Sequence, residues 1–192
     1  MSIFQELHDD VFELLNTKLP HTLKYHSPDH TAYVIEKAEY ISRQENVSGR
    51  ELFLVKVAAL FHDIGFIIQR KNHEEVGCGI CTEKLTKHDF DPKEIEAICG
   101  MIMATKIPQS PKNLLEEIVA DADLEYLGTD LFYPISQNLF QEFKNYNPAL
   151  TINKFDEIQA NFMRRHHYHT NYGVTHLEGK KQQHLKEILS TM

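Results

Sequence analysis

The chain has 192 residues, 42% of them hydrophobic and 25% charged, and its formal net charge is −8 at pH 7. This composition is ordinary for one soluble globular domain that is large enough to bury a sizeable core. The negative charge and the lack of a basic run argue against nucleic acid as a partner. No stretch approaches the length of a membrane span, and the acidic N-terminus lacks the features of a signal peptide. We therefore expect a cytoplasmic protein without a membrane partner.

Apolar residues recur at helical spacing along most of the chain, and the alternation typical of strands is almost absent. Serine, threonine, aspartate and proline residues mark several helix starts. We therefore predict an all-α fold, a single compact helical domain of eight or nine helices over residues 1–192. The last helix is polar, and we expect it at the surface. The predicted helices span about residues 2–19, 28–46, 48–65, 72–88, 92–103, 111–124, 129–145, 151–166 and 175–190.

The stretch from Ala58 to Phe66 places two ionisable side chains inside the most apolar part of the sequence. The helix that leads into it is apolar nearly all round, so His62 and Asp63 should be buried. Burying an uncompensated carboxylate costs several kcal/mol, so Asp63 needs a cation or a set of hydrogen-bond donors. A metal ion supplies that cation and also accepts the neutral imidazole of His62.

Further side chains could complete a metal site. His30 lies just inside the second predicted helix, and Asp121 and Asp123 lie at the end of another apolar helix. Two imidazoles and two carboxylates suit Mn²⁺, Fe²⁺, Ni²⁺, Co²⁺, Zn²⁺ or Mg²⁺, and spacing does not choose among them. His26 falls in the turn before its helix, so we expect it to approach a substrate rather than share the metal. The candidate ligands are His30, His62, Asp63 and one of Asp121 and Asp123.

Three motifs occur in order: Tyr25-His26-x-x-x-His30, Ala59-Leu60-Phe61-His62-Asp63-Ile64-Gly65 and Asp121-Ala122-Asp123-Leu124. Together they resemble the motifs of the HD-domain superfamily of metal-dependent phosphohydrolases. The resemblance covers about residues 20–130, on which the helices of residues 129–192 would pack. It implies that His30, His62 and Asp63 bind metal together with a last aspartate. It also implies a general-acid role for His26, and His73 matches an extra histidine of members that bind two metals.

Two positions depart from the family pattern. Many members carry a histidine one helix before the last aspartate, where this chain has Lys106, which could hold a phosphate oxygen instead. The usual last aspartate is followed by a basic residue and a leucine, whereas here Asp123 directly precedes Leu124. We favour Asp121 as the metal ligand, because Asp123 could then accept a hydrogen bond from a ligand or orient water.

The predicted function is that of a phosphatase or phosphodiesterase that needs one or two divalent metal ions. Hydroxide formed on the metal would attack a phosphate mono- or diester, in a nucleotide or a similar small metabolite. Imidazole titrates near neutral pH, so His26 could protonate the leaving oxygen. Lys106, Arg164 and Arg165 are candidate contacts for the phosphate.

Two other functions remain open. A related branch of the same fold binds two irons and activates oxygen, but this chemistry needs more ligands than we can assign, with His73 as the only clear spare. A non-catalytic nucleotide-binding regulatory module is the second alternative, although such a module has no need for buried carboxylates. A homo-oligomer is possible in each case.

Overall fold

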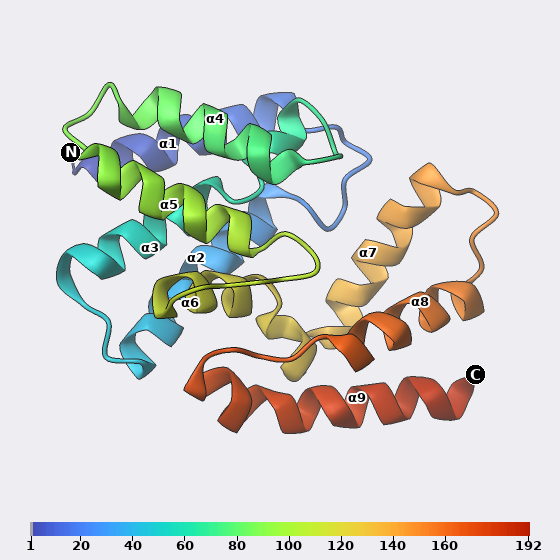
Figure 1. Ribbon diagram of the computed structural model, residues 1–192. Helices are drawn as coiled ribbons and strands as arrows, with labels where there is room; N and C mark the ends of the chain where they lie inside the picture. Colours follow the sequence, from blue (N-terminus) through green and yellow to red (C-terminus); the bar gives the residue numbers. More distant parts are fainter. Residues whose placement is uncertain (1) are drawn as a thin grey trace.

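The computed structural model describes residues 2–192 and confirms the all-α prediction (Figure 1). Within these residues there are nine α-helices and no strands. Three short turns connect them: two 3₁₀ turns, η1 (Ile64–Ile67) and η2 (Glu125–Gly128), and one π-helical turn, η3 (Gly173–Leu177). The α-helices are α1 (Ile3–Lys18), α2 (Pro28–Gln44), α3 (Gly49–Phe61), α4 (His73–Leu85), α5 (Pro92–Ala104), α6 (Leu114–Asp123), α7 (Phe132–Tyr146), α8 (Ile152–Arg165) and α9 (Glu178–Thr191).

Local sequence explains most helix starts. Ser27 caps α2, since its side chain accepts the backbone N–H of His30, and Pro28 occupies the first helical position. The predicted start of α6 after Ser110 is wrong. The side chain of Asn113 caps that helix instead, so α6 begins at Leu114.

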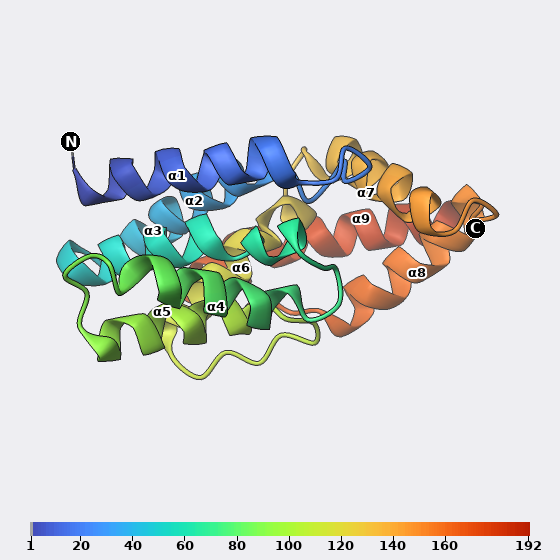
Figure 2. The ribbon, with the colours of Figure 1, turned by 90° about the horizontal axis from the view of Figure 1, so that it is seen from above.

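Helices α1 to α6 form a bundle around α3, which is buried on nearly all sides. Figure 2 shows α1 and α2 on one side of α3, with α4 and α5 on the other. Helices α7, α8 and α9 lie at one end of the bundle and share a smaller core with η2 and η3. This second group therefore covers the end of the bundle at which α3 and α6 finish.

Helix α9 differs from the surface helix that we expected, because one of its faces is buried against η2 and α8. Its Lys181 is fully buried. The ammonium group donates to the carbonyl oxygen of His166 at 2.7 Å and to the carboxylate of Glu178 at 2.8 Å. Lysine is rarely buried unless it is paired, and these two partners were not visible in the polar sequence pattern.

Gly65 allows two segments to approach closely. A Cβ atom at this position would lie 1.9 Å from the carbonyl oxygen of His73, at the start of α4. The start of α4 therefore packs directly against η1, and this contact holds His73 beside the end of α3.

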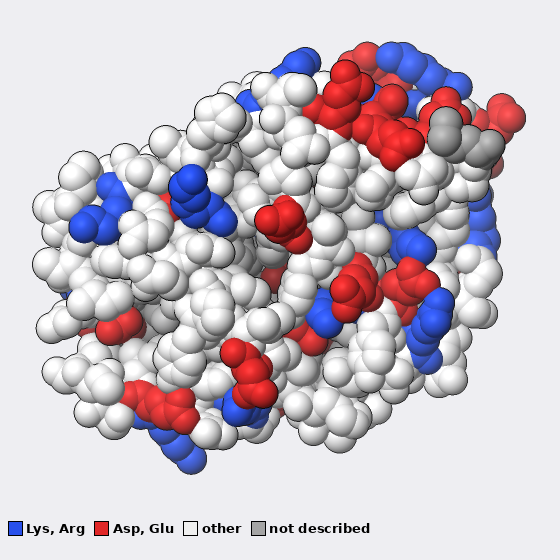
Figure 3. Space-filling model, turned by 180° about the vertical axis from the view of Figure 1, so that it is seen from behind, with Lys and Arg blue, Asp and Glu red and all other residues white. Residues whose placement is uncertain are grey.

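The surface shows no long charged stripe on the face seen in Figure 3, where acidic and basic side chains are interspersed. None of the helices in residues 2–192 combines the length and the apolar character that a membrane crossing requires.

Candidate metal centre and substrate pocket

Four side chains from three helix ends converge inside the bundle. The Nε2 atoms of His30 and His62 lie 3.4 Å apart. Asp123 Oδ1 lies 3.0 Å from Nε2 of His30 and 3.7 Å from Nε2 of His62. Asp63 Oδ2 lies 3.2 Å and 3.6 Å from the same two nitrogen atoms. The ligand atoms of His30, His62 and Asp123 all lie within 4.8 Å of one another, so these three side chains resemble part of a coordination shell, with Asp63 beside them.

The end of α3 fixes the ring of His62. Its Nδ1 lies 2.7 Å from the carbonyl oxygen of Ala59, one helical turn earlier, and donates a hydrogen bond to it. Such a bond sets the tautomer of a neutral imidazole, in which Nε2 would carry the lone pair, and Nε2 faces His30 and the carboxylates. A metal-binding histidine usually has this arrangement.

The electrostatics of the cluster favour a positive charge at its centre. Burial opposes a charge on His62, but Asp63 and Asp123 outweigh it and raise the pKa of His62 to about 9. Burial also opposes a charge on Asp63, yet His62 and its neighbours hold the pKa of this carboxyl well below its usual range. Asp63 Oδ2 is buried and accepts no hydrogen bond. A divalent cation would satisfy this oxygen and both imidazoles at once, so the residues fit a metal ion.

Asp121, our preferred last ligand, faces away from this cluster. Its carboxylate accepts hydrogen bonds from the backbone N–H groups of His169 and Thr170, both at 2.9 Å, and from the Thr170 hydroxyl at 2.7 Å. Burial raises the pKa of Asp121 to about 6 in spite of these donors. Residues two apart on a helix point in nearly opposite directions, so only one aspartate can face the imidazoles, and it is Asp123. The structure therefore corrects the preference for Asp121.

His73 lies on the far side of Asp63. Its Nδ1 donates to the backbone oxygen of Arg70 at 3.1 Å, and its Nε2 lies 3.4 Å from Asp63 Oδ1. The two oxygens of Asp63 thus face different imidazoles. Burial opposes a charge on His73, but Asp63 outweighs it and raises the pKa of His73.

His26 is held by a glutamate that sequence reasoning missed. Glu142, on α7, is fully buried, and its Oε1 lies 2.6 Å from Nδ1 of His26. Its Oε2 accepts the backbone N–H groups of Tyr25 and His26 at 3.0 and 3.1 Å. Burial opposes a charge on Glu142, but its contacts with His26 outweigh this cost and lower its pKa. The sequence could have pointed to Glu142 through its position beside Phe140 and Phe143, on the apolar face of a predicted helix.

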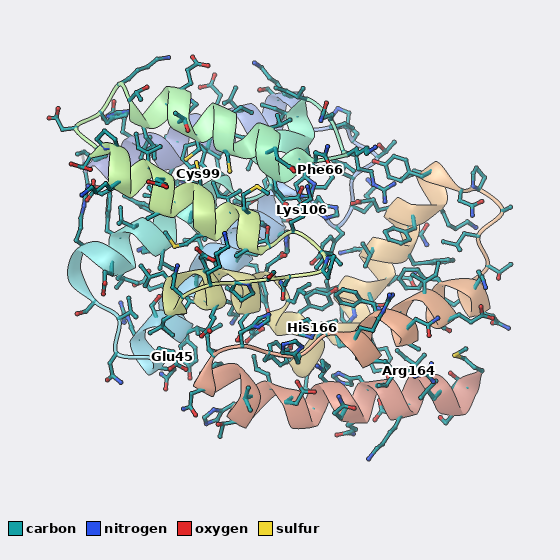
Figure 4. The ribbon with its side chains drawn as sticks, viewed as in Figure 1. Glu45, Phe66, Cys99, Lys106, Arg164 and His166 are labelled. Atoms are coloured by element: carbon teal, nitrogen blue, oxygen red, sulfur yellow. The ribbon has the colours of Figure 1, made fainter. Side chains whose placement is uncertain are left out.

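A cavity of about 420 Å³ adjoins the cluster, between the bundle and helices α7 and α8. Its lining combines charged and polar side chains with apolar and aromatic ones. Figure 4 labels Phe66 and Lys106, which both line this cavity. The polar lining residues include His26, Asp63, Arg70, His73, Lys106 and Asp123. The apolar and aromatic lining residues include Leu124, Tyr126, Leu139, Phe143, Phe155 and Phe162.

The predicted phosphate contacts are placed differently from one another. Lys106 lines the cavity but forms an ion pair with Glu75. Arg164 and Arg165 do not line it, and both donate to Asn161 on their own helix. Arg164 lies near α9, away from Lys106, in Figure 4. Arg165 instead lines a neighbouring cavity of about 260 Å³ that shares Ile107 and Phe162 with this one, and a contact of either arginine with a substrate stays a prediction.

Comparisons with known proteins agree on the fold. A family model described as HD domain matches residues 29–125. The crystal structure of a predicted HD superfamily hydrolase from an uncultured Thermotogales bacterium has a TM-score of 0.57 and 21% identity, over 84% of this chain and 89% of that chain. The crystal structure of Bacillus subtilis YpgQ in complex with ADP has a TM-score of 0.63 and 16% identity, over 98% of this chain and 96% of that chain. A search among curated proteins returns no significant match.

Proposed function

Because this chain belongs to the HD-domain family, we propose that it is a metal-dependent phosphohydrolase, which cleaves a phosphate mono- or diester. One observation carries the proposal. The Oδ2 of Asp63 is buried and accepts no hydrogen bond, and it lies 3.6 and 3.2 Å from the Nε2 atoms of His30 and His62. The cluster opens on a cavity of about 420 Å³, which provides room for a substrate at the same place.

The metal would be held by His30, His62, Asp63 and Asp123. When bound, a divalent ion supplies a Lewis acid for a phosphoryl oxygen and lowers the pKa of its water towards about 7. The mixed nitrogen and oxygen ligands are compatible with Mn²⁺, Fe²⁺, Ni²⁺, Co²⁺, Zn²⁺ or Mg²⁺. A second ion would use Oδ1 of Asp63 together with His73, whose Nε2 lies 3.4 Å away.

His26 is the proposed general acid. Glu142 accepts the Nδ1 proton of His26, so the Nε2 of the ring is the atom that remains for a substrate. The ring stacks on Phe66, with the two centroids 4.2 Å apart, which fixes its plane beside the cavity. With Nε2 protonated, His26 can give a proton to the leaving oxygen of a phosphate ester.

A nucleotide is the proposed substrate class. The charged and polar lining residues suit phosphate groups, and the aromatic lining residues Tyr126 and Phe155 suit a flat base. The ADP bound to YpgQ, a protein with a similar fold, supports a nucleotide as ligand. Lys106 is a candidate for a phosphate contact, although it must first leave its ion pair with Glu75.

Elemental analysis and a substrate screen test the proposal together. The purified protein should contain a divalent metal and, with Mn²⁺ added, should hydrolyse at least one compound from a panel of mono-, di-, tri- and cyclic nucleotides. Asp63→Asn should lose metal and activity. Asp130→Asn, which changes an exposed aspartate paired with Lys180, should retain both.

Two results would contradict the proposal. Binding of nucleotides without turnover would favour a regulatory module. Iron content with oxygen uptake, and without phosphate release, would favour the oxygenase alternative.

A further inference from the structure

We propose that Arg70 binds a second phosphate group of the substrate, beyond the phosphate held at the metal centre. This role would make Arg70 a specificity residue that favours nucleoside di- and triphosphates over monophosphates. The inference rests on the proposed function, because it concerns the same cavity.

Arg70 lies at the edge of the cavity, in the segment between η1 and α4. Its backbone oxygen accepts a hydrogen bond from His73, which faces Asp63 at 3.4 Å. This hydrogen bond holds the backbone of Arg70 next to His73, which itself contacts the proposed ligand Asp63. Its side chain reaches the rings of Phe143 and Tyr146 on α7.

Within the part of the chain that the structure describes, residues 2–192, the guanidinium group has no anionic partner. Of the two cationic side chains that line the cavity, Lys106 is paired with Glu75. For Arg70, no carboxylate within residues 2–192 lies within ion-pairing distance, and its side chain donates no hydrogen bond to another residue of this range. Arginine stays charged at every physiological pH, so an uncompensated positive charge stands at the cavity edge.

Two aromatic rings hold this group in place. The guanidinium carbon lies 4.2 Å from the ring centroid of Tyr146 and 5.6 Å from that of Phe143. Cation–π stacking uses the face of the guanidinium, whereas its five N–H donors point outwards in its plane. The group is therefore oriented by α7 while its donors stay free. Such a fork can donate two parallel hydrogen bonds to one phosphate.

The charge of the site explains why a second phosphate needs this residue. A divalent ion would balance Asp63 and Asp123, and the cavity also contains Glu74. Each added phosphate brings further negative charge into an acidic surrounding, and a cation near it offsets the repulsion. A monophosphate would place its only phosphate at the metal and would not reach Arg70.

Steady-state kinetics on nucleoside mono-, di- and triphosphates with one base test the inference. Arg70→Ala should lower kcat/KM for the di- and triphosphate about 10- to 100-fold, mainly through KM, because one charge-assisted contact is lost. The monophosphate should change by less than about threefold. Arg70→Lys should recover only part of the loss, since lysine lacks the planar fork. Lys71→Ala is the matched control, because this neighbouring cation does not line the cavity.

Calorimetric binding of ADP and AMP separates this inference from the proposed function. If the wild type hydrolyses neither compound but Arg70→Ala weakens ADP binding more than AMP binding, the proposed function fails and the role of Arg70 stands. An equal loss for both ligands, or no loss for ADP, would overturn the inference. Failure of the wild type to bind ADP would overturn it too. Tyr146→Leu should weaken ADP binding in the same direction, and the melting temperatures of all variants show whether each one folds.

Discussion

Oε1 of Glu142 lies 2.6 Å from Nδ1 of His26, although the two residues are 116 positions apart in the chain. Both lie outside the segment 29–125 that the HD-domain family model matches. Helix α7 thus contributes a buried carboxylate that orients a side chain at the edge of the cavity. The proposed general acid, His26, therefore depends on α7, a helix that carries none of the three sequence motifs.

Replacing Glu142 with glutamine should show whether this side chain orients His26 for catalysis or only supports the fold. The amide keeps the shape of the side chain but removes the charge that holds the imidazole, so kcat should fall about 10- to 100-fold. The lost contacts should also cost about 1–3 kcal/mol of stability. The pH profile of kcat should change while metal content remains, and Glu83→Gln, at an exposed position, is the control. An unchanged pH profile would show that Glu142 only supports the fold.

The two aspartates at the end of α6 should respond differently to the same change. Asp123→Asn should reduce metal content, because its Oδ1 lies 3.0 Å from Nε2 of His30. Asp121→Asn should keep the metal but lose about 1–3 kcal/mol of stability, because an amide cannot accept all the donors from His169 and Thr170. Elemental analysis and chemical denaturation measure the two effects. Metal loss in Asp121→Asn alone would reverse the assignment.

Removal of bound metal should destabilise the wild type. An ion that binds only the folded state adds stability, so a chelator should lower the melting temperature and Mn²⁺ should restore it. In Asp63→Asn neither treatment should have an effect, since the unpartnered carboxylate oxygen is gone. An equal response of both proteins would place the metal elsewhere.

Acid stability should depend on His166. Burial and the ammonium of Lys181 lower the pKa of His166 to about 3, whereas Glu178 acts in the opposite direction. The unfolded chain, with a pKa near 6.5, binds a proton that the folded chain excludes. Stability from this residue is therefore complete above about pH 6.5 and declines as the pH falls towards 3, by up to about 1.4 kcal/mol per pH unit.

The measurement compares unfolding free energies between pH 6.5 and 5, above the range in which most carboxylates titrate. His166→Gln should give a shallower decline than the wild type, because glutamine does not take up a proton. His21→Gln, at an exposed position, should follow the wild type. Identical slopes for all three proteins would contradict the assignment.

A methyl group at position 65 should separate α4 from η1. In Gly65→Ala the new Cβ would lie 1.9 Å from the backbone oxygen of His73, so the start of α4 must move. We expect a loss of about 1–3 kcal/mol and reduced activity. Gly79→Ala is the matched control, because nothing lies within 4 Å of its Cβ, and alanine there should stabilise the helix by up to about 1 kcal/mol. Equal stability of the two variants would contradict the close approach.

Local sequence information was sufficient for the helices and for part of the site. Apolar periodicity and caps such as Ser27 predicted the helices to within a few residues, because these signals act within one turn. The apolar surroundings of His62 and Asp63 indicated a buried charge that needs a cation.

The rest depends on contacts that no local pattern records. Glu142 meets His26 only through tertiary packing, and Arg70 meets Tyr146 in the same way. Asp121 and Asp123 could not be told apart, because the direction of each depends on the exact end of α6. Composition alone suggested a phosphate role for Arg164 and Arg165, and neither of them lines the cavity beside His26 and Asp63.

The hydrogen bonds that Asp121 accepts from Thr170 join the end of α6 that carries Asp123 to a segment that follows α8. A fragment cut after position 125 would retain every motif yet leave this carboxylate, fully buried in the whole protein, without its donors. Solvent would also reach the end of the bundle that α7 to α9 cover. We therefore expect such a fragment to lose its metal and to unfold readily, so the shortest autonomous unit extends well past the motif-bearing region.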